Sequence, residues 1–86
     1  MRSRRITVCG HEWTLREHAK RWDAGLDGEC SGPPLREIRI YRSGDREADR
    51  ETLYHELVHA VEMELGAPLK HRTVREIACV LARARL

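Results

Sequence analysis

The 86-residue sequence has few aromatic residues: it contains no phenylalanine, two tryptophans and two tyrosines. A chain of this length buries only a modest share of its unfolded surface, so these absences predict a thin core in a single domain spanning residues 1–86. Charged residues make up 35% of the chain, which suits a heavily charged surface over that core. Any function therefore has to fit one small site.

Cysteine is also scarce, and the three cysteines form no CxxC pair. This excludes a disulfide framework and a four-cysteine zinc site, and it favours reduced thiols in the cytoplasm. No apolar run is long enough to span a membrane, and the basic start Met1–Arg5 is followed by no apolar stretch typical of a signal peptide. We therefore expect a cytoplasmic protein without a membrane partner.

The chain also lacks a strong excess of either charge: its 16 Lys and Arg residues are nearly balanced by 14 Asp and Glu residues, which gives a formal net charge of +2. The basic residues are spread along the chain and interspersed with acids, which favours a solvated surface. A nucleic-acid partner is compatible with this balance but is not indicated by it.

The N-terminal part has the period of β-strands. Residues 5–9 and 12–16 alternate apolar and polar side chains around a turn at 10–11, which predicts a two-stranded hairpin. A short segment with helical character over 17–22 leads into 25–34, where three glycines and two prolines predict a turn-rich connection.

The second half changes from strand period to helical period. Residues 36–42 alternate charged and apolar side chains, which predicts a half-buried strand, placed at a sheet edge because of its arginines. Residues 45–65 carry a broad apolar arc at helical spacing, ended by Gly66 and Pro68, and a last helix is expected from Lys70. The fold class is therefore α+β, a small antiparallel sheet of hairpin and edge strand packed on two helices.

The first long helix contains the stretch TLYHELVHAVE over residues 52–62, in which His55, Glu56 and His59 form an HExxH motif. The two histidines are one turn apart on one side of the helix, so their imidazoles can converge on one ion. Glu56 points about 100° away from His55, which suits contact with a metal-bound water better than metal ligation.

This arrangement has a coherent chemistry. Neutral imidazoles suit Zn²⁺, and two on one helix leave room for a third protein ligand and a water. The zinc lowers the pKa of its water, and Glu56 can take the proton and later pass it to a leaving amine. The pattern therefore indicates zinc-dependent hydrolysis of peptide or amide bonds. The alternative is coincidence, with two surface histidines and a solvated glutamate.

The stretch TLYHELVHAVE resembles the active-site helix of the zincin metallopeptidases. The order of the REIRIYR strand, this helix, Gly66 and a final helix is similar to the very small zincin-like metallopeptidases of phages and prophages, and more distantly to the ImmA/IrrE and SprT-like groups. The resemblance covers roughly residues 36–80. It implies a zincin-like fold, His55 and His59 as zinc ligands, and Glu56 as general base. It also implies a peptide or protein substrate, bound in extended form by the strand before the helix.

A third zinc ligand is expected downstream. The similar small proteins place an acidic residue near the start of the final helix, where this chain has His71, twelve residues after His59. Because Gly66 lies between them, the last helix can fold back and present His71. Glu76 is the alternative ligand, and Glu62, one turn after His59, suits a hydrogen-bond partner of that histidine.

Tyr41 ends the strand before the helix and is a candidate for stabilising an oxyanion, although a strand-end aromatic is more often structural. The function expected from the sequence is that of a zinc metallopeptidase in which Glu56 activates a zinc-bound water. A second hypothesis is a non-catalytic module, with structural zinc or none, that binds a protein or nucleic acid through a basic sheet.

Overall fold

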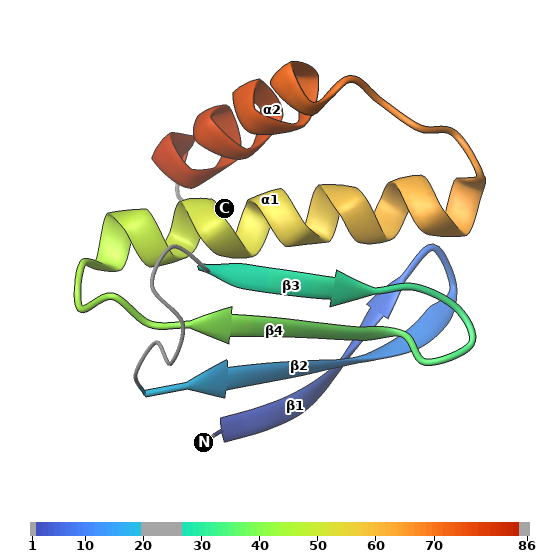
Figure 1. The fold of residues 1–86 in the computed structure, drawn as a ribbon, viewed down its shortest axis with the longest axis horizontal. Helices are drawn as coiled ribbons and strands as arrows, with labels where there is room; N and C mark the ends of the chain where they lie inside the picture. Colours follow the sequence, from blue (N-terminus) through green and yellow to red (C-terminus); the bar gives the residue numbers. More distant parts are fainter. Residues whose placement is uncertain (1, 20–26, 85–86) are drawn as a thin grey trace.

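The computed structural model describes residues 2–19 and 27–84, which form four strands and two helices. The elements are β1 (Arg2–Val8), β2 (His11–His18), β3 (Gly28–Ser31), β4 (Glu37–Tyr41), α1 (Arg46–Leu65) and α2 (His71–Ala84). They stack as three layers, with α1 lying across one face of the sheet and α2 lying on α1, on the side away from the sheet (Figure 1). The predicted α+β class is confirmed.

The N-terminal hairpin is also confirmed, but its turn is at Cys9 and Gly10, one residue earlier than the predicted 10–11, because His11 already pairs with Val8. Both turn residues have positive φ, 49° and 81°, as a two-residue type I′ turn requires. Glu17 and His18 continue β2 instead of starting a helical segment. Residues 20–22 of that segment and residues 25–26 of the expected connection lie outside the described residues.

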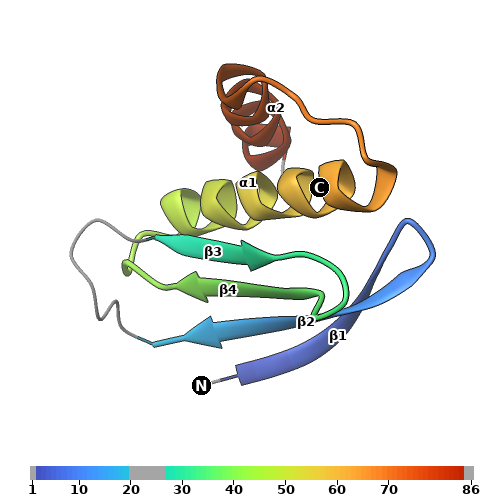
Figure 2. The same ribbon diagram turned by 45° about the vertical axis from the view of Figure 1, so that its right-hand side comes forward.

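The sheet is mixed, with the strand order β1-β2-β4-β3 (Figure 2). β4 pairs parallel with β2 and antiparallel with β3. The prediction of an antiparallel sheet with residues 36–42 at its edge is therefore wrong: β2 and β4 pair parallel and β4 is internal. The two edge strands are β1 and β3, and β3 lies within the segment expected to be a connection.

Arg39, in the middle of β4, lies on the outer face of the sheet, which no described helix covers. Arg39 pairs there with Glu29 at 2.8 Å and with Glu37, and Arg16 pairs with Glu37 at 2.6 Å. A sheet covered on one side can carry charged residues on a central strand, because every second side chain faces water. The alternation of charged and apolar residues over 36–42 therefore indicates a half-buried strand, but it does not indicate that the strand is at an edge of the sheet.

The core lies between the sheet and α1. Its buried members come from β1, β2 and β4 and meet Ala60 of α1, with partly buried leucines of α1 packed against them: Val8, Trp13, Leu15, Ile38, Ile40, Leu53 and Leu57. Near the C-terminal end of α1, the Glu64 carboxylate accepts hydrogen bonds from Trp13 Nε1 at 2.9 Å and from Arg36 Nε at 2.8 Å. These contacts fix the orientation of α1 on the sheet.

Both ends of α1 are capped. The Asp45 side chain accepts hydrogen bonds from the backbone amides of Glu47 and Ala48, and Gly66 ends the helix at φ 64°, a left-handed conformation that glycine adopts freely. The chain then turns back over 67–70, and α2 begins at His71. The predicted helix bounds are therefore confirmed, and the return path places the start of α2 over α1.

Candidate metal centre

Three histidines converge where the start of α2 lies over α1. His55 and His59 lie one turn apart on α1, and their Nε2 atoms are 3.1 Å apart. His71, the first residue of α2, brings its ring to within 5.1 Å of the His55 ring and 6.0 Å of the His59 ring, measured between centroids. One ring nitrogen from each residue lies within 4.8 Å of the other two.

This donor set fits a zinc ion. Zinc binds histidine nitrogens at about 2.0–2.1 Å, so two nitrogens of a tetrahedral site lie about 3.3 Å apart, close to the spacing of His55 and His59. Three imidazoles with the fourth position free are one of the ligand sets of catalytic zinc. Among the residues that the structure describes, His55, His59 and His71 are the one such group.

Glu62 lies where the sequence analysis expects it, beside His59. Its Oε1 is 2.7 Å from Nδ1 of His59, which leaves Nε2 of that ring facing His55. Its Oε2 accepts a hydrogen bond from the backbone amide of Leu69 at 2.6 Å. The Leu69 amide is the first cause of the lowered pKa of the Glu62 carboxyl, followed by His59. Glu62 thus orients one ring and also holds the loop that leads to His71.

Glu56 lies on the side of α1 that faces β3, and only 8% of it is exposed. Its carboxylate has no hydrogen bond or ion pair within the described part of the chain. Burial raises its pKa, which makes the carboxylate a stronger base than a solvated one. Its Cγ would lie 3.2 Å from a Cβ placed on Gly28, so the glycine leaves the space that Glu56 occupies.

A groove of about 450 Å³ opens beside this carboxylate. It is lined by His55 and Glu56, by further acidic and small residues of α1 and the loops around it, and by one residue of α2: Asp27, Gly28, Ser43, Ala48, Asp49, Glu51, Thr52 and Arg75. One histidine of the cluster, His55, and the buried base thus face the same groove.

The electrostatics of the cluster favour metal binding. Burial lowers the pKa of His55, and the charges of His59, His71 and Arg75 act in the same direction. A neutral imidazole is the form that binds zinc, so this shift keeps His55 available as a ligand at lower pH.

The structure does not bring the other candidates to the site. Glu76 is solvent-exposed and accepts from Arg72 Nε at 3.1 Å, so His71 is the better third ligand. Tyr41 is on the outer face of the sheet, opposite to α1, where its hydroxyl donates to Glu29 at 3.0 Å and its ring stacks on His18. The proposed oxyanion role of Tyr41 is therefore not supported. Its separation by odd numbers from the buried Ile38 and Ile40 already places it on that face.

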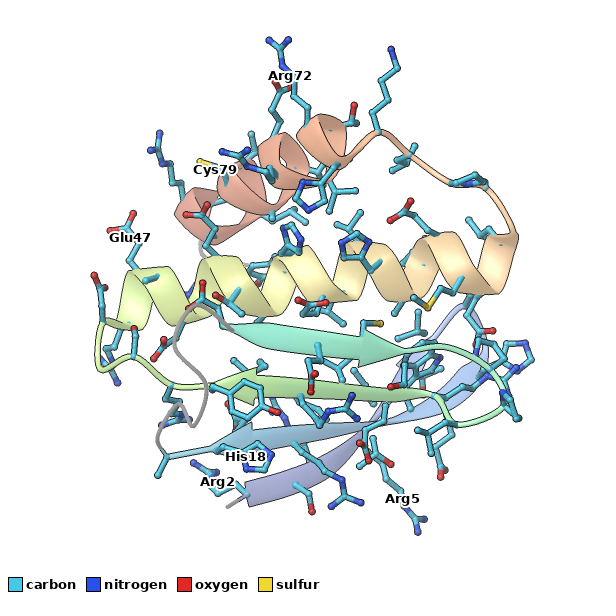
Figure 3. The ribbon with its side chains drawn as sticks, viewed as in Figure 1. Arg2, Arg5, His18, Glu47, Arg72 and Cys79 are labelled. Carbon is cyan, nitrogen blue, oxygen red and sulfur yellow. The ribbon has the colours of Figure 1, made fainter. Side chains whose placement is uncertain are left out.

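Side-chain directions separate the site from its surroundings. His18 lies at the sheet, away from the helices, and Arg72 projects from α2 away from α1 (Figure 3). Arg75, which the sequence analysis did not single out, lines the groove. Its signal in the sequence is its position four residues after His71, on the same side of α2.

None of the described helices is long and apolar enough to cross a membrane. No family model, curated protein or solved structure matches this chain, so the residues of the site itself are the basis for proposing a function.

Proposed function

We propose that this protein is a zinc-dependent hydrolase of peptide bonds, with His55, His59 and His71 as the metal ligands. The observation that supports the proposal is the convergence of three imidazole nitrogens near the buried carboxylate of Glu56, which has no hydrogen bond or ion pair with any described residue and which lines a groove together with His55. A zinc ion held by these nitrogens would supply a Lewis acid that polarises a carbonyl group and lowers the pKa of water.

Glu56 acts as the general base. It takes a proton from the attacking water, whose oxygen adds to the carbonyl carbon of the substrate. The carbon–nitrogen bond then breaks while Glu56 returns the proton to the leaving nitrogen, which gives a carboxylic acid and an amine and leaves Glu56 unchanged. Its raised pKa suits both transfers, because the group gains and loses a proton within one cycle.

The substrate lies in extended form along β3. This strand is at the edge of the sheet, no described strand pairs with its second side, and it lies next to α1, where Gly28 faces Glu56. Backbone groups at a sheet edge can pair with an added strand. This assignment replaces the strand before the helix, because β4 already has neighbours on both sides.

The outer sheet face gives little support to the alternative of a nucleic-acid-binding module. The arginines of β2 and β4 on this face are bound to carboxylates, Arg16 to Glu37 and Arg39 to Glu29 and Glu37. Their charge is largely balanced within the sheet, so few free cations remain there to follow phosphates.

The test compares the wild type with Glu56→Gln on unfolded casein and on a library of fluorogenic peptides. We expect the variant to bind zinc as the wild type does and to lose hydrolysis by roughly 10²-fold or more. A wild type that binds zinc and cleaves nothing would overturn the proposed activity and favour a structural metal. Activity that persists in Glu56→Gln would overturn the role of Glu56.

A further inference from the structure

The groove beside Glu56 contains one permanent cation among its described lining residues, Arg75 of α2. The other ionisable groups of the lining are His55 and the carboxylates of Asp27, Asp49, Glu51 and Glu56. A single guanidinium in an otherwise acidic groove, next to a cluster of metal-binding type, requires an explanation.

Arg75 has no hydrogen bond or ion pair within the described part of the chain, whereas its neighbour Arg72 is bound to Glu76 at 3.1 Å. The Glu51 carboxylate lines the same groove without pairing with it. Arg75 lies one turn after His71, so its side chain leaves the same side of α2 that carries the histidine. Its five donors are therefore free for a ligand in the groove.

Arg75 and Glu56 belong to different walls. Glu56 lies against β3, where its Cγ lies next to Gly28, whereas Arg75 comes from α2. His55 lines the groove together with both of them. A base on one wall and a cation on the other suit carbonyl addition, because the water attacks from the side of the base and the negative charge develops on the carbonyl oxygen.

We propose that Arg75 is a further catalytic residue, which donates hydrogen bonds to the carbonyl oxygen of the substrate as that oxygen becomes negative. The inference rests on the proposed hydrolysis and fills the role that Tyr41 cannot take. The guanidinium keeps its protons throughout, so no bond to Arg75 forms or breaks.

The kinetic test uses Arg75→Met, Arg75→Lys and, as matched control on the same helix, Arg72→Met, each with its zinc content and thermal midpoint measured. Arg75→Met is expected to lower kcat by roughly 10²-fold with KM nearly unchanged. Arg75→Lys should recover part of the loss, and Arg72→Met should match the wild type. A kcat that is unchanged in Arg75→Met, or a loss confined to KM, would overturn the assignment.

A second readout does not depend on turnover. Dimethylphosphinate, a tetrahedral anion with one charge shared by two oxygens, is titrated into each protein with one equivalent of zinc and followed by phosphorus NMR. Arg75→Met should bind it about tenfold more weakly than the wild type and Arg72→Met equally well. Equal affinity in Arg75→Met, or no binding to the wild type, would overturn the inference. Arg75-dependent binding by a wild type that cleaves no peptide would overturn only the proposed hydrolysis.

Discussion

The Glu62 carboxylate lies 2.7 Å from Nδ1 of His59, and its other oxygen accepts from the backbone amide of Leu69 at 2.6 Å. One side chain therefore fixes a ring on α1 and also the loop that delivers His71. Partners of this kind set the tautomer and orientation of a metal-binding histidine.

Glu62→Gln should weaken zinc binding by about 10–100-fold while the chain stays folded, because the single amide oxygen carries no charge and cannot accept from both His59 and the Leu69 amide. The measurement is a competition titration with a chromogenic chelator. Glu47→Gln, an exposed glutamate in the first turn of the same helix, is the matched control and should bind as the wild type does. Equal affinities for Glu62→Gln and Glu47→Gln would contradict the role of Glu62.

The choice between the two downstream ligand candidates is decided by zinc content after dialysis. The wild type should retain about one zinc ion per chain, His71→Ala should lose it, and Glu76→Ala should retain it, since Glu76 is bound to Arg72 on an exposed turn. Loss of zinc in Glu76→Ala, with His71→Ala unaffected, would exchange the two assignments.

Gly28→Ala should lower the free energy of unfolding by about 1–3 kcal/mol, because the added Cβ would lie 3.0 Å from Thr52 Cγ2 and 3.1 Å from the Arg39 carbonyl oxygen. The backbone of β4 cannot move aside easily. In the contrasting variant, Gly32→Ala, the nearest atom is the sulfur of Met63 at 2.7 Å, the mobile end of a flexible side chain. Urea unfolding should therefore show a smaller loss for Gly32→Ala, and the reverse order would contradict the packing of β3 on α1.

Glu64 should stabilise the fold in a pH-dependent way. The hydrogen bond from Arg36 is the main cause that holds the Glu64 pKa below its ordinary value of 4.5, and Trp13 contributes in the same direction. A lowered folded pKa means that the stabilisation is complete above pH 4.5 and is lost as the pH falls through the lowered value.

Thermal unfolding should therefore show Glu64→Gln below the wild type at pH 7, with the difference narrowing as the pH falls below 4.5. Glu12→Gln is the control, because the Arg5–Glu12 pair is 79% and 66% exposed and should contribute little at any pH. A Glu64→Gln deficit that stays constant down to pH 3 would contradict the ion pair as its source.

Cys30 should be slow to react. Burial, and then the charge of Glu56, raise the pKa of its thiol to about 12, so only about one part in 10⁴ is thiolate at pH 8. Cys9 is exposed in the hairpin turn. Alkylation by iodoacetamide, followed by peptide mass spectrometry, should label Cys9 well before Cys30. Equal alkylation rates for Cys9 and Cys30 would contradict the partly buried position of the Cys30 side chain, on the side of β3 that faces α1.

Local sequence patterns predicted the two helices, the hairpin and the histidine pair. The helical period, the capping glycine and the HExxH spacing all depend on residues that are close together in the sequence. The order of the strands was not predictable in this way. β3 has only four residues and begins with Gly28. A larger residue there would crowd Thr52 and Glu56, which are about 25 positions away in the sequence. The sequence around it therefore has the composition of a turn.

The same distinction applies to the site. His55, Glu56 and His59 share one helix, so their geometry follows from their spacing. His71 and Arg75 depend on how α2 folds back, and that path is set by the Glu62–Leu69 hydrogen bond and by packing between helices. The choice of Tyr41 overlooked that strand alternation places it on the face opposite to Ile38 and Ile40.

The layer order has a consequence for cooperativity. α1 contacts the sheet on one side and α2 on the other, whereas α2 contacts no described element except α1. The outer helix can therefore detach by local unfolding while the sheet and α1 remain intact. A metal ion bound by His71 and by the two histidines of α1 would suppress this local unfolding. The free energy of packing α2 on α1 and the affinity for the ion would therefore be thermodynamically linked.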